Sequence, residues 1–180
     1  MARDRRGQIL DVAAGLFVVT GFKGTSLQDI ANGVGCSKAS LLYHFSGKDA
    51  ILTELLGPVT AELAELDARL AGLDGEEAVR IAVEGYVDLV LRFRREVKIL
   101  LDDLEQMFRH PALGDVHQMV DRLVDALAGG RSADPAARIA AAMVLGGVAV
   151  AGARAGETAD LTDEELRAAL VRGALRTLDH

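Results

Sequence analysis

The sequence has few of the residues that support small secreted proteins. It contains one cysteine, Cys36, and no tryptophan, and aromatic residues make up 4% of its 180 residues. A single cysteine excludes an intramolecular disulfide framework, which small secreted domains commonly need. Because half of the residues are hydrophobic, we expect a chain that folds around an ordinary apolar core in the reducing cytoplasm.

The sequence also lacks a long hydrophobic run. The longest one, residues 139–153, is bracketed by Arg138 and Arg154 and is shorter than the roughly 20 residues that span a bilayer. We predict a buried helix there and no membrane partner. The N-terminal MARDRRGQ is not followed by the continuous apolar stretch of a secretory signal, which again favours a cytoplasmic protein.

Proline is rare, with three residues in the chain, and no segment shows the alternation of a convincing strand. Apolar residues instead recur at helical spacing, which predicts an all-α fold of about nine helices. We expect a bend or short break in the RFRRE segment, residues 92–96. The predicted helices cover residues 3–20, 26–34, 37–45, 46–70, 74–94, 95–108, 111–128, 135–155 and 162–178.

One of the three prolines, Pro58, falls inside the fourth predicted helix, directly after Gly57. Proline removes a helical hydrogen bond and clashes with the carbonyl four residues earlier, here that of Glu54, at a cost of about 3 kcal/mol. The apolar stripe continues on the same face beyond this step. We therefore predict one helix, bent at Pro58, rather than two.

Two short helices with a glycine between them occupy residues 26–45. Ser26 and Asp29 have the spacing of a capping box, Gly35 lies where a helix C-terminus favours glycine, and Ser37 can cap the second helix. This is a helix-turn-helix pattern, in which the second helix enters the DNA major groove. Residues 1–50 carry a net charge of +2 in a chain of −7, which agrees with a DNA-binding head on an acidic body.

At these residues the sequence resembles the TetR family of transcriptional regulators, over about the first 55 residues. The resemblance is carried by TSLQDIA at 25–31, GCSKASL at 35–41, YHF at 43–45 and KDAIL at 48–52. It implies a homodimer that binds a pseudo-palindromic operator in double-stranded DNA, usually as a repressor, and that a small-molecule effector releases. It also implies two parts.

The first of these parts is a DNA-binding domain at residues 1–48. The second is a ligand-binding and dimerisation domain at 49–180, and the helix at about 46–70 connects them. The DNA-contacting positions implied by the resemblance are Thr25, Ser26, Ser37, Lys38, Ala39, Ser40, Leu42, Tyr43, His44 and Lys48. Many relatives have tyrosine where this chain has Leu42, which cannot donate a hydrogen bond but can contact a thymine methyl group. The operator sequence therefore cannot be taken from a relative.

The C-terminal part carries weaker signals. Candidate pocket residues are Tyr86, Phe93, Leu100, Met107, Phe108, His117, Met119 and Met143, although apolar side chains at helical spacing are also typical of plain core. His110 and His117 lack a third ligand at convincing spacing, so we expect no metal site. We also expect no cofactor. No nucleophile–base pair indicates an enzyme.

The last two predicted helices are rich in small residues and in aligned leucines. Two such helices from each subunit would form a two-fold interface, although alanine-rich helices also pack inside monomers. Our hypothesis for regulation is that the helix containing Pro58 tilts on ligand binding and changes the distance between the two recognition helices. The rival hypothesis is a small-molecule-binding helical protein that retains a vestigial DNA-binding head.

Overall fold

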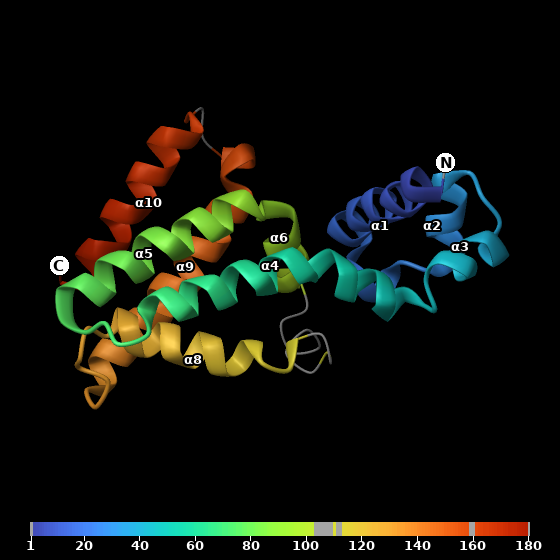
Figure 1. Ribbon diagram of the computed structural model, residues 1–180. Coiled ribbons are helices and arrows are strands. Elements are labelled where there is room, and N and C mark those ends of the chain that lie inside the picture. Colours follow the sequence, from blue (N-terminus) through green and yellow to red (C-terminus); the bar gives the residue numbers. More distant parts are fainter. Residues whose placement is uncertain (1, 103–109, 111–112, 159–160, 180) are drawn as a thin grey trace.

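The computed structural model describes residues 2–102, 110, 113–158 and 161–179, and within these ranges the chain forms nine helices and no strand (Figure 1). This confirms the predicted all-α fold. The helices are α1 (Ala2–Gly24), α2 (Leu27–Val34), α3 (Lys38–His44), α4 (Lys48–Leu70), α5 (Gly75–Arg92), α6 (Arg94–Asp102), α8 (Val116–Leu127), α9 (Pro135–Thr158) and α10 (Asp163–Thr177).

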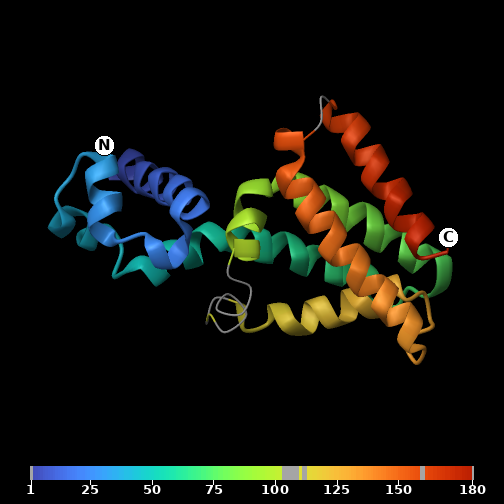
Figure 2. The same ribbon diagram turned by 180° about the vertical axis from the view of Figure 1, so that it is seen from behind.

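The helices form two parts, which we call the head and the body. The head consists of α1, α2 and α3, and the body of α5, α8, α9 and α10. The long helix α4 runs from the head into the body, as two opposite views show (Figures 1 and 2). Helix α6 lies where the parts meet, because it contacts α1 of the head as well as α9, α4 and α5.

Local signals in the sequence set most helix ends. The capping box predicted at Ser26 of α2 is present, and a second capping box lies at Thr162 of α10. Gly35 has a φ of 71° at the end of α2, which is a left-handed conformation that glycine adopts without strain. The expected break in the RFRRE segment falls at Phe93, whose φ of −115° and ψ of 38° separate α5 from α6.

One predicted helix start is wrong. We expected a helix from Pro111, but α8 begins at Val116. Before it, the Leu113 amide donates to the His110 carbonyl at 2.9 Å in a tight turn, and Gly114 follows, a residue with poor helix propensity. Pro111 itself and residues 103–109 of the predicted 95–108 helix lie outside the described part of the chain.

Helix α4 is a single helix with Pro58 inside it, as predicted. The Thr60 hydroxyl donates to the Gly57 carbonyl at 2.9 Å, next to the position where proline removes an amide donor. The inward stripe of α4 continues on both sides of this step, with Leu52 and Leu56 on one side and Leu63 on the other, all buried. One continuous helix therefore contributes to the cores of both the head and the body.

Each part has its own buried cluster. The body cluster is centred on α5, with Val79, Val83, Val87 and Val90 almost fully buried. The head cluster combines side chains of α1 to α4 with two from further along the chain. Its members are Ile9, Ala13, Ala14, Phe17, Phe22, Ile30, Ala31, Leu41, Phe45, Ile51, Leu52, Leu55, Leu56, Ile99 and Leu113.

Charged pairs link neighbouring helices on the surface of the body. These pairs are Arg92 with Glu62, Arg94 with Asp163, Arg122 with Asp67, and Arg167 with Asp88. Each joins two different helices and is at least partly exposed to solvent, so each contributes little to the stability of the fold. Their main effect is to favour one register between helices that the apolar core already holds together.

Helix α9 is less buried than predicted. Its segment from Pro135 to Arg154 is long and apolar enough to cross a membrane, by length and composition alone. Only 33% of this apolar stretch is buried inside the protein. Ile139, Met143 and Val150 are 61%, 63% and 45% exposed. The expectation of a buried helix was therefore only half right, because one face packs on the body and the opposite face presents apolar side chains to the surface.

The packing of α9 against α5 predicts a sensitive position. A Cβ atom added at Gly152 would lie 2.5 Å from Cγ1 of Val90, a stiff and fully buried β-branched side chain. We expect Gly152→Ala to lower the free energy of unfolding by roughly 1–3 kcal/mol, measured by urea denaturation. The control is Gly15→Ala in α1, where nothing lies within 4 Å and a gain of about 0.5–1 kcal/mol is expected. Equal effects of the two changes would contradict this packing.

Candidate nucleic-acid interface and apolar cavity

Helix α3 is held by one side chain and exposes most of the others. Leu41 is fully buried in the head cluster. On the outer side, Tyr43 is 87% and Leu42 43% exposed, and Lys38, Ala39 and Ser40 are exposed on the first turn. The anchor is thus apolar and internal, and the outer surface carries one cation, a hydroxyl and a phenol.

Side-chain caps fix the starts of α2 and α3. The Ser26 amide and hydroxyl donate to the Asp29 carboxylate at 2.8 and 2.6 Å, and the Asp29 amide donates back to the Ser26 hydroxyl. These hydrogen bonds from Ser26 lower the pKa of Asp29. At the start of α3, the Ser37 hydroxyl accepts from the Ser40 amide at 3.1 Å. The same residues that were predicted to face DNA therefore also build the local fold.

Two of the predicted DNA-contacting residues have side chains that serve the head itself. Thr25 is 2% exposed, and its hydroxyl donates to the Gly21 carbonyl at 2.8 Å. The Lys48 ammonium donates to the carbonyls of Thr25, at 2.8 Å, and Phe22. It also lies 4.4 Å from the centre of the Phe22 ring, and burial lowers its pKa. A DNA contact from Thr25 would have to use its main chain.

Arg6 is a structural residue of the interface that the sequence pattern did not single out. Its guanidinium donates to the His44 carbonyl at 2.7 Å and pairs with Glu54 of α4. It also lies 4.2 Å from the centre of the Phe45 ring. Arg6 thereby ties the end of α3 to α1 and α4, and the side chain of His44 is left half-buried beside Tyr43.

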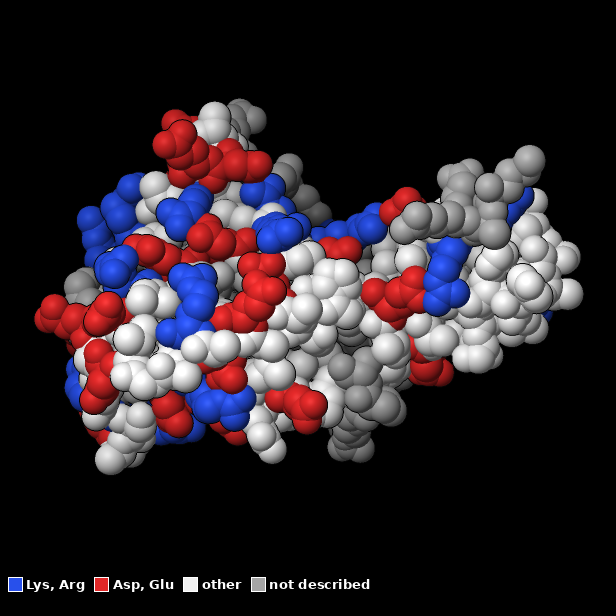
Figure 3. Space-filling view, in the orientation of Figure 1, with Lys and Arg blue, Asp and Glu red and all other residues white. Residues whose placement is uncertain are grey.

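The charge on the head is modest. In Figure 3 the body shows interleaved acidic and basic side chains, whereas the outer part of the head shows few charges on this face. Two of the cations in residues 1–50 already have partners within the protein. Arg6 pairs with Glu54, and Lys48 donates to backbone carbonyls. Lys38 is left as the exposed cation of the first turn of α3.

The body contains an apolar cavity of about 290 Å³. It is surrounded by α4, α5, α6, α8 and α9 and by the turn before α8. The lining residues are Leu56, Val59, Thr60, Leu63, Tyr86, Leu89, Val97, Leu100, Leu101, Leu113, Val116, Val120, Leu123, Leu145, Gly146 and Ala149. Its volume is near the lower end of the range for small-molecule sites.

Two of the eight predicted pocket residues line this cavity, namely Tyr86 and Leu100. Phe93 and Met119 pack on the body core outside the cavity. His117 is exposed, and Met143 is 63% exposed on the outer face of α9. Met107 and Phe108 lie outside the described residues. The aliphatic residues that form most of the wall were missed, because a leucine beside a cavity has the same helical spacing as a leucine in a filled core.

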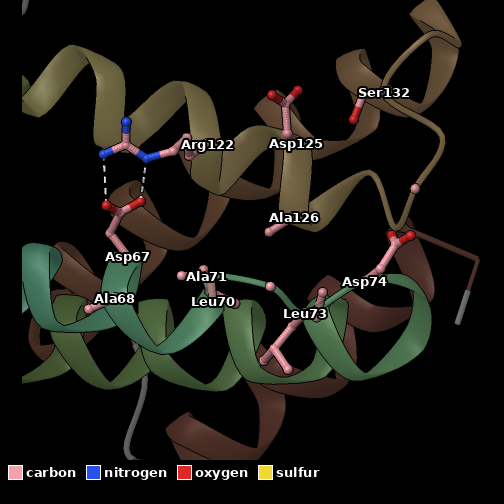
Figure 4. A pocket seen from close by; sticks show the side chains of 13 residues that line it. Asp67, Ala68, Leu70, Ala71, Leu73, Asp74, Arg122, Asp125, Ala126 and Ser132 are labelled. Carbon is pink, nitrogen blue, oxygen red and sulfur yellow. Dashed lines mark hydrogen bonds and ion pairs between the residues drawn. The ribbon is translucent and has the colours of Figure 1, made fainter.

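A second, more polar depression of about 380 Å³ lies where the α4–α5 turn meets α8 (Figure 4). Its carboxylates already have partners. Arg122 donates two hydrogen bonds of 2.7 Å to Asp67 and lowers the pKa of that carboxyl. Asp74 caps α5 through the Gly75 amide, and Asp125 pairs with Arg138. Asp67 and Asp125 thus link α4 with α8 and α8 with α9, and within the described residues no group of three potential metal ligands occurs.

Three helices packed around an apolar cluster, with the third helix exposed on its outer side, are the arrangement found in helix-turn-helix proteins. The family model for bacterial regulatory proteins of the tetR family matches residues 9–55. Over 52 residues the chain is 42% identical to the HTH-type transcriptional repressor KstR2 of Mycobacterium tuberculosis, a match that covers 29% of this chain and 26% of that protein. With KstR2 of Rhodococcus jostii the identity is 29% over 107 residues, or 57% of this chain and 52% of that protein.

The similarity to solved structures extends over both parts. A TetR-like transcriptional regulator from Rhodococcus sp. RHA1 superposes with a TM-score of 0.67 at 26% identity, over 97% of this chain and 96% of the other. The chain is thus similar to TetR-family regulators, with the family match itself confined to residues 9–55. The sequence matches to the curated relatives span only a quarter to a half of their lengths.

The position of Lys48 predicts a role in stability. We expect Lys48→Met to lower the free energy of unfolding by about 1–3 kcal/mol, because two carbonyls lose a charged donor. Lys38→Met, on the exposed first turn of α3, serves as the control and should change it by less than about 0.5 kcal/mol. Thermal and urea unfolding measure both. If the two variants were equally stable, the inward position of Lys48 would be of no energetic consequence.

Proposed function

We propose that this protein is a sequence-specific DNA-binding regulator, acting as a repressor, that binds a pseudo-palindromic operator as a homodimer and is released by a small molecule. The observation that supports the proposal most directly is α3, which a single buried leucine anchors and whose outer face is exposed. This helix belongs to the segment, residues 9–55, that matches the tetR-family model. We also propose that DNA binding resides in residues 1–48 and ligand binding and dimerisation in 49–180.

The outer face of α3 has the chemistry that reading DNA requires. The free amides of the α3 N-terminus and the Ser37 hydroxyl, which still has its own proton to donate, suit a phosphate oxygen. Lys38 adds a positive charge one residue later. Tyr43 and Ser40 can donate to phosphates or base edges, and Leu42 offers an apolar contact for a thymine methyl group.

The exposed apolar face of α9 supports a homodimer. Ile139, Met143 and Val150 lie on one side of this helix, and Gly146 and Gly147 between them allow close approach of a second helix. A two-fold axis beside α9 and α10 would bury the same surface on both subunits. It would also place two copies of α3 on one DNA molecule, where successive major grooves are about 34 Å apart.

For the regulatory step, we propose that α4 transmits the state of the body to the head. It carries Leu52 in the head cluster and Leu63 in the body cluster, with Pro58 between them. A ligand that favours one tilt of α4 would change the separation of the two α3 helices. A coupling of about 1–3 kcal/mol is sufficient for such an effect.

Selection of bound sites from a random DNA library tests the DNA-binding proposal. An enriched pseudo-palindrome, bound with nanomolar affinity that falls steeply as salt rises, is the expected result. Absence of any enriched site, together with weak binding that ignores sequence, would instead favour a small-molecule-binding protein with a vestigial head.

The exposed cation of α3 gives a quantitative prediction. Lys38→Ala should weaken binding to the selected site, and it should lower the slope of log K against log salt by about 1, because one phosphate contact is lost. Arg69→Ala, at an exposed position at the far end of α4, is the matched control and should leave the slope unchanged. A slope that is the same in both variants would remove Lys38 from the interface.

The outer face of α9 gives a second prediction. Met143→Glu should shift the protein from dimer to monomer in sedimentation-velocity experiments at micromolar concentration, because two carboxylates would be buried without partners at the two-fold interface. Val19→Glu is the control, since Val19 is 81% exposed on α1 of the head. A dimer that tolerates Met143→Glu as well as Val19→Glu would have its interface elsewhere.

A further inference from the structure

The wall of the body cavity is free of charge over the residues that the structure describes. Leucine and valine make up most of it, and only Thr60 and Tyr86 carry polar side-chain atoms. A charged ligand would have to leave water without gaining an ionic partner from this wall, and burial of an unpaired charge is strongly unfavourable. The composition of the wall therefore selects against ions.

The two polar side chains already use their protons within the protein. The Tyr86 hydroxyl donates to the Leu145 carbonyl at 3.1 Å, and the Thr60 hydroxyl donates to the Gly57 carbonyl at 2.9 Å. Burial raises the pKa of Tyr86 well above its usual range, so this phenol stays neutral. Neither group offers a ready donor to a ligand anion, and the cavity provides mainly apolar contact.

The cavity is also continuous with the head cluster. Leu56 of α4 and Leu113 before α8 are buried members of that cluster and line the cavity as well. Leu100 and Val116 line the cavity and pack on the same cluster. A molecule in the cavity would thus contact the very side chains on which the head rests.

We infer that this cavity binds one uncharged, predominantly apolar molecule of up to about 300 Å³ per chain. A role of that molecule as the effector rests on the proposed function, whereas the binding itself requires no DNA.

A pair of fluorescent probes with the same ring system tests the chemical class. N-phenyl-1-naphthylamine is neutral, and 8-anilino-1-naphthalenesulfonate adds one sulfonate. The neutral probe should bind the full chain saturably, one molecule per chain, and at least about tenfold more tightly than the sulfonate. Titrations at about 0.15 M salt, where the Debye length is about 8 Å, limit the influence of the acidic surface.

Two matched substitutions on α8 locate the site. Val120 lines the cavity, whereas Val124, one turn further along, packs on the body core without lining it, and both are half-buried. Val120→Phe should fill part of the cavity and weaken binding of the neutral probe at least about tenfold. Val124→Phe should leave that affinity within about twofold, with circular dichroism confirming helical structure in both.

Equal affinities for the two probes, no saturable binding of the neutral probe, or equal effects of the two substitutions would each overturn the inference. If Val120→Phe does not fold, Ala149→Leu on α9, which also lines the cavity, takes its place. The titrations contain no DNA. A protein that binds the neutral probe as expected but selects no DNA site would therefore disprove the proposed function and leave the assignment of the cavity intact.

Discussion

The arrangement of the molecule depends on the burial of Ile99, a residue of α6, in the core of the head. Its side chain is 2% exposed and lies in the same cluster as Phe17 of α1 and Leu52 of α4. Burying an isoleucine of this kind contributes about 1.5–3 kcal/mol, and the energy is shared by two parts of the chain. Helix α6 therefore holds the head at a defined position on the body, where α4 alone would leave a single connection.

Under the proposed function, this junction is where a small energetic input in the body would change the position of the head. Well-packed apolar clusters resist gradual deformation, so a change in one wall is accommodated by discrete repacking. The cavity borders such a cluster directly at Leu113, which is 3% exposed. Surface ion pairs such as Arg167 with Asp88 are too weak to oppose a rearrangement of this kind.

Much of the fold could be predicted from the sequence, because short-range chemistry determines it. The capping box at Ser26, the glycine at position 35 and the break near Phe93 are local signals, and each falls where it was expected. The inward position of the Lys48 side chain could not be predicted, since it depends on carbonyls 23 and 26 residues away. Most residues of the cavity wall could not be predicted either. Helical periodicity identifies the inward face of a helix but does not show whether the space next to that face is filled.

The chain has no tryptophan and two tyrosines, and the structure puts these two in contrasting places. Tyr43 is 87% exposed on α3, and Tyr86 is enclosed in the wall of the cavity with its hydroxyl bonded to the Leu145 carbonyl. The near-ultraviolet emission of the protein thus originates from one residue at each proposed binding surface. Replacing either tyrosine with phenylalanine leaves the other as a single intrinsic reporter, so events at the DNA-facing helix and at the cavity become spectroscopically separable without a label.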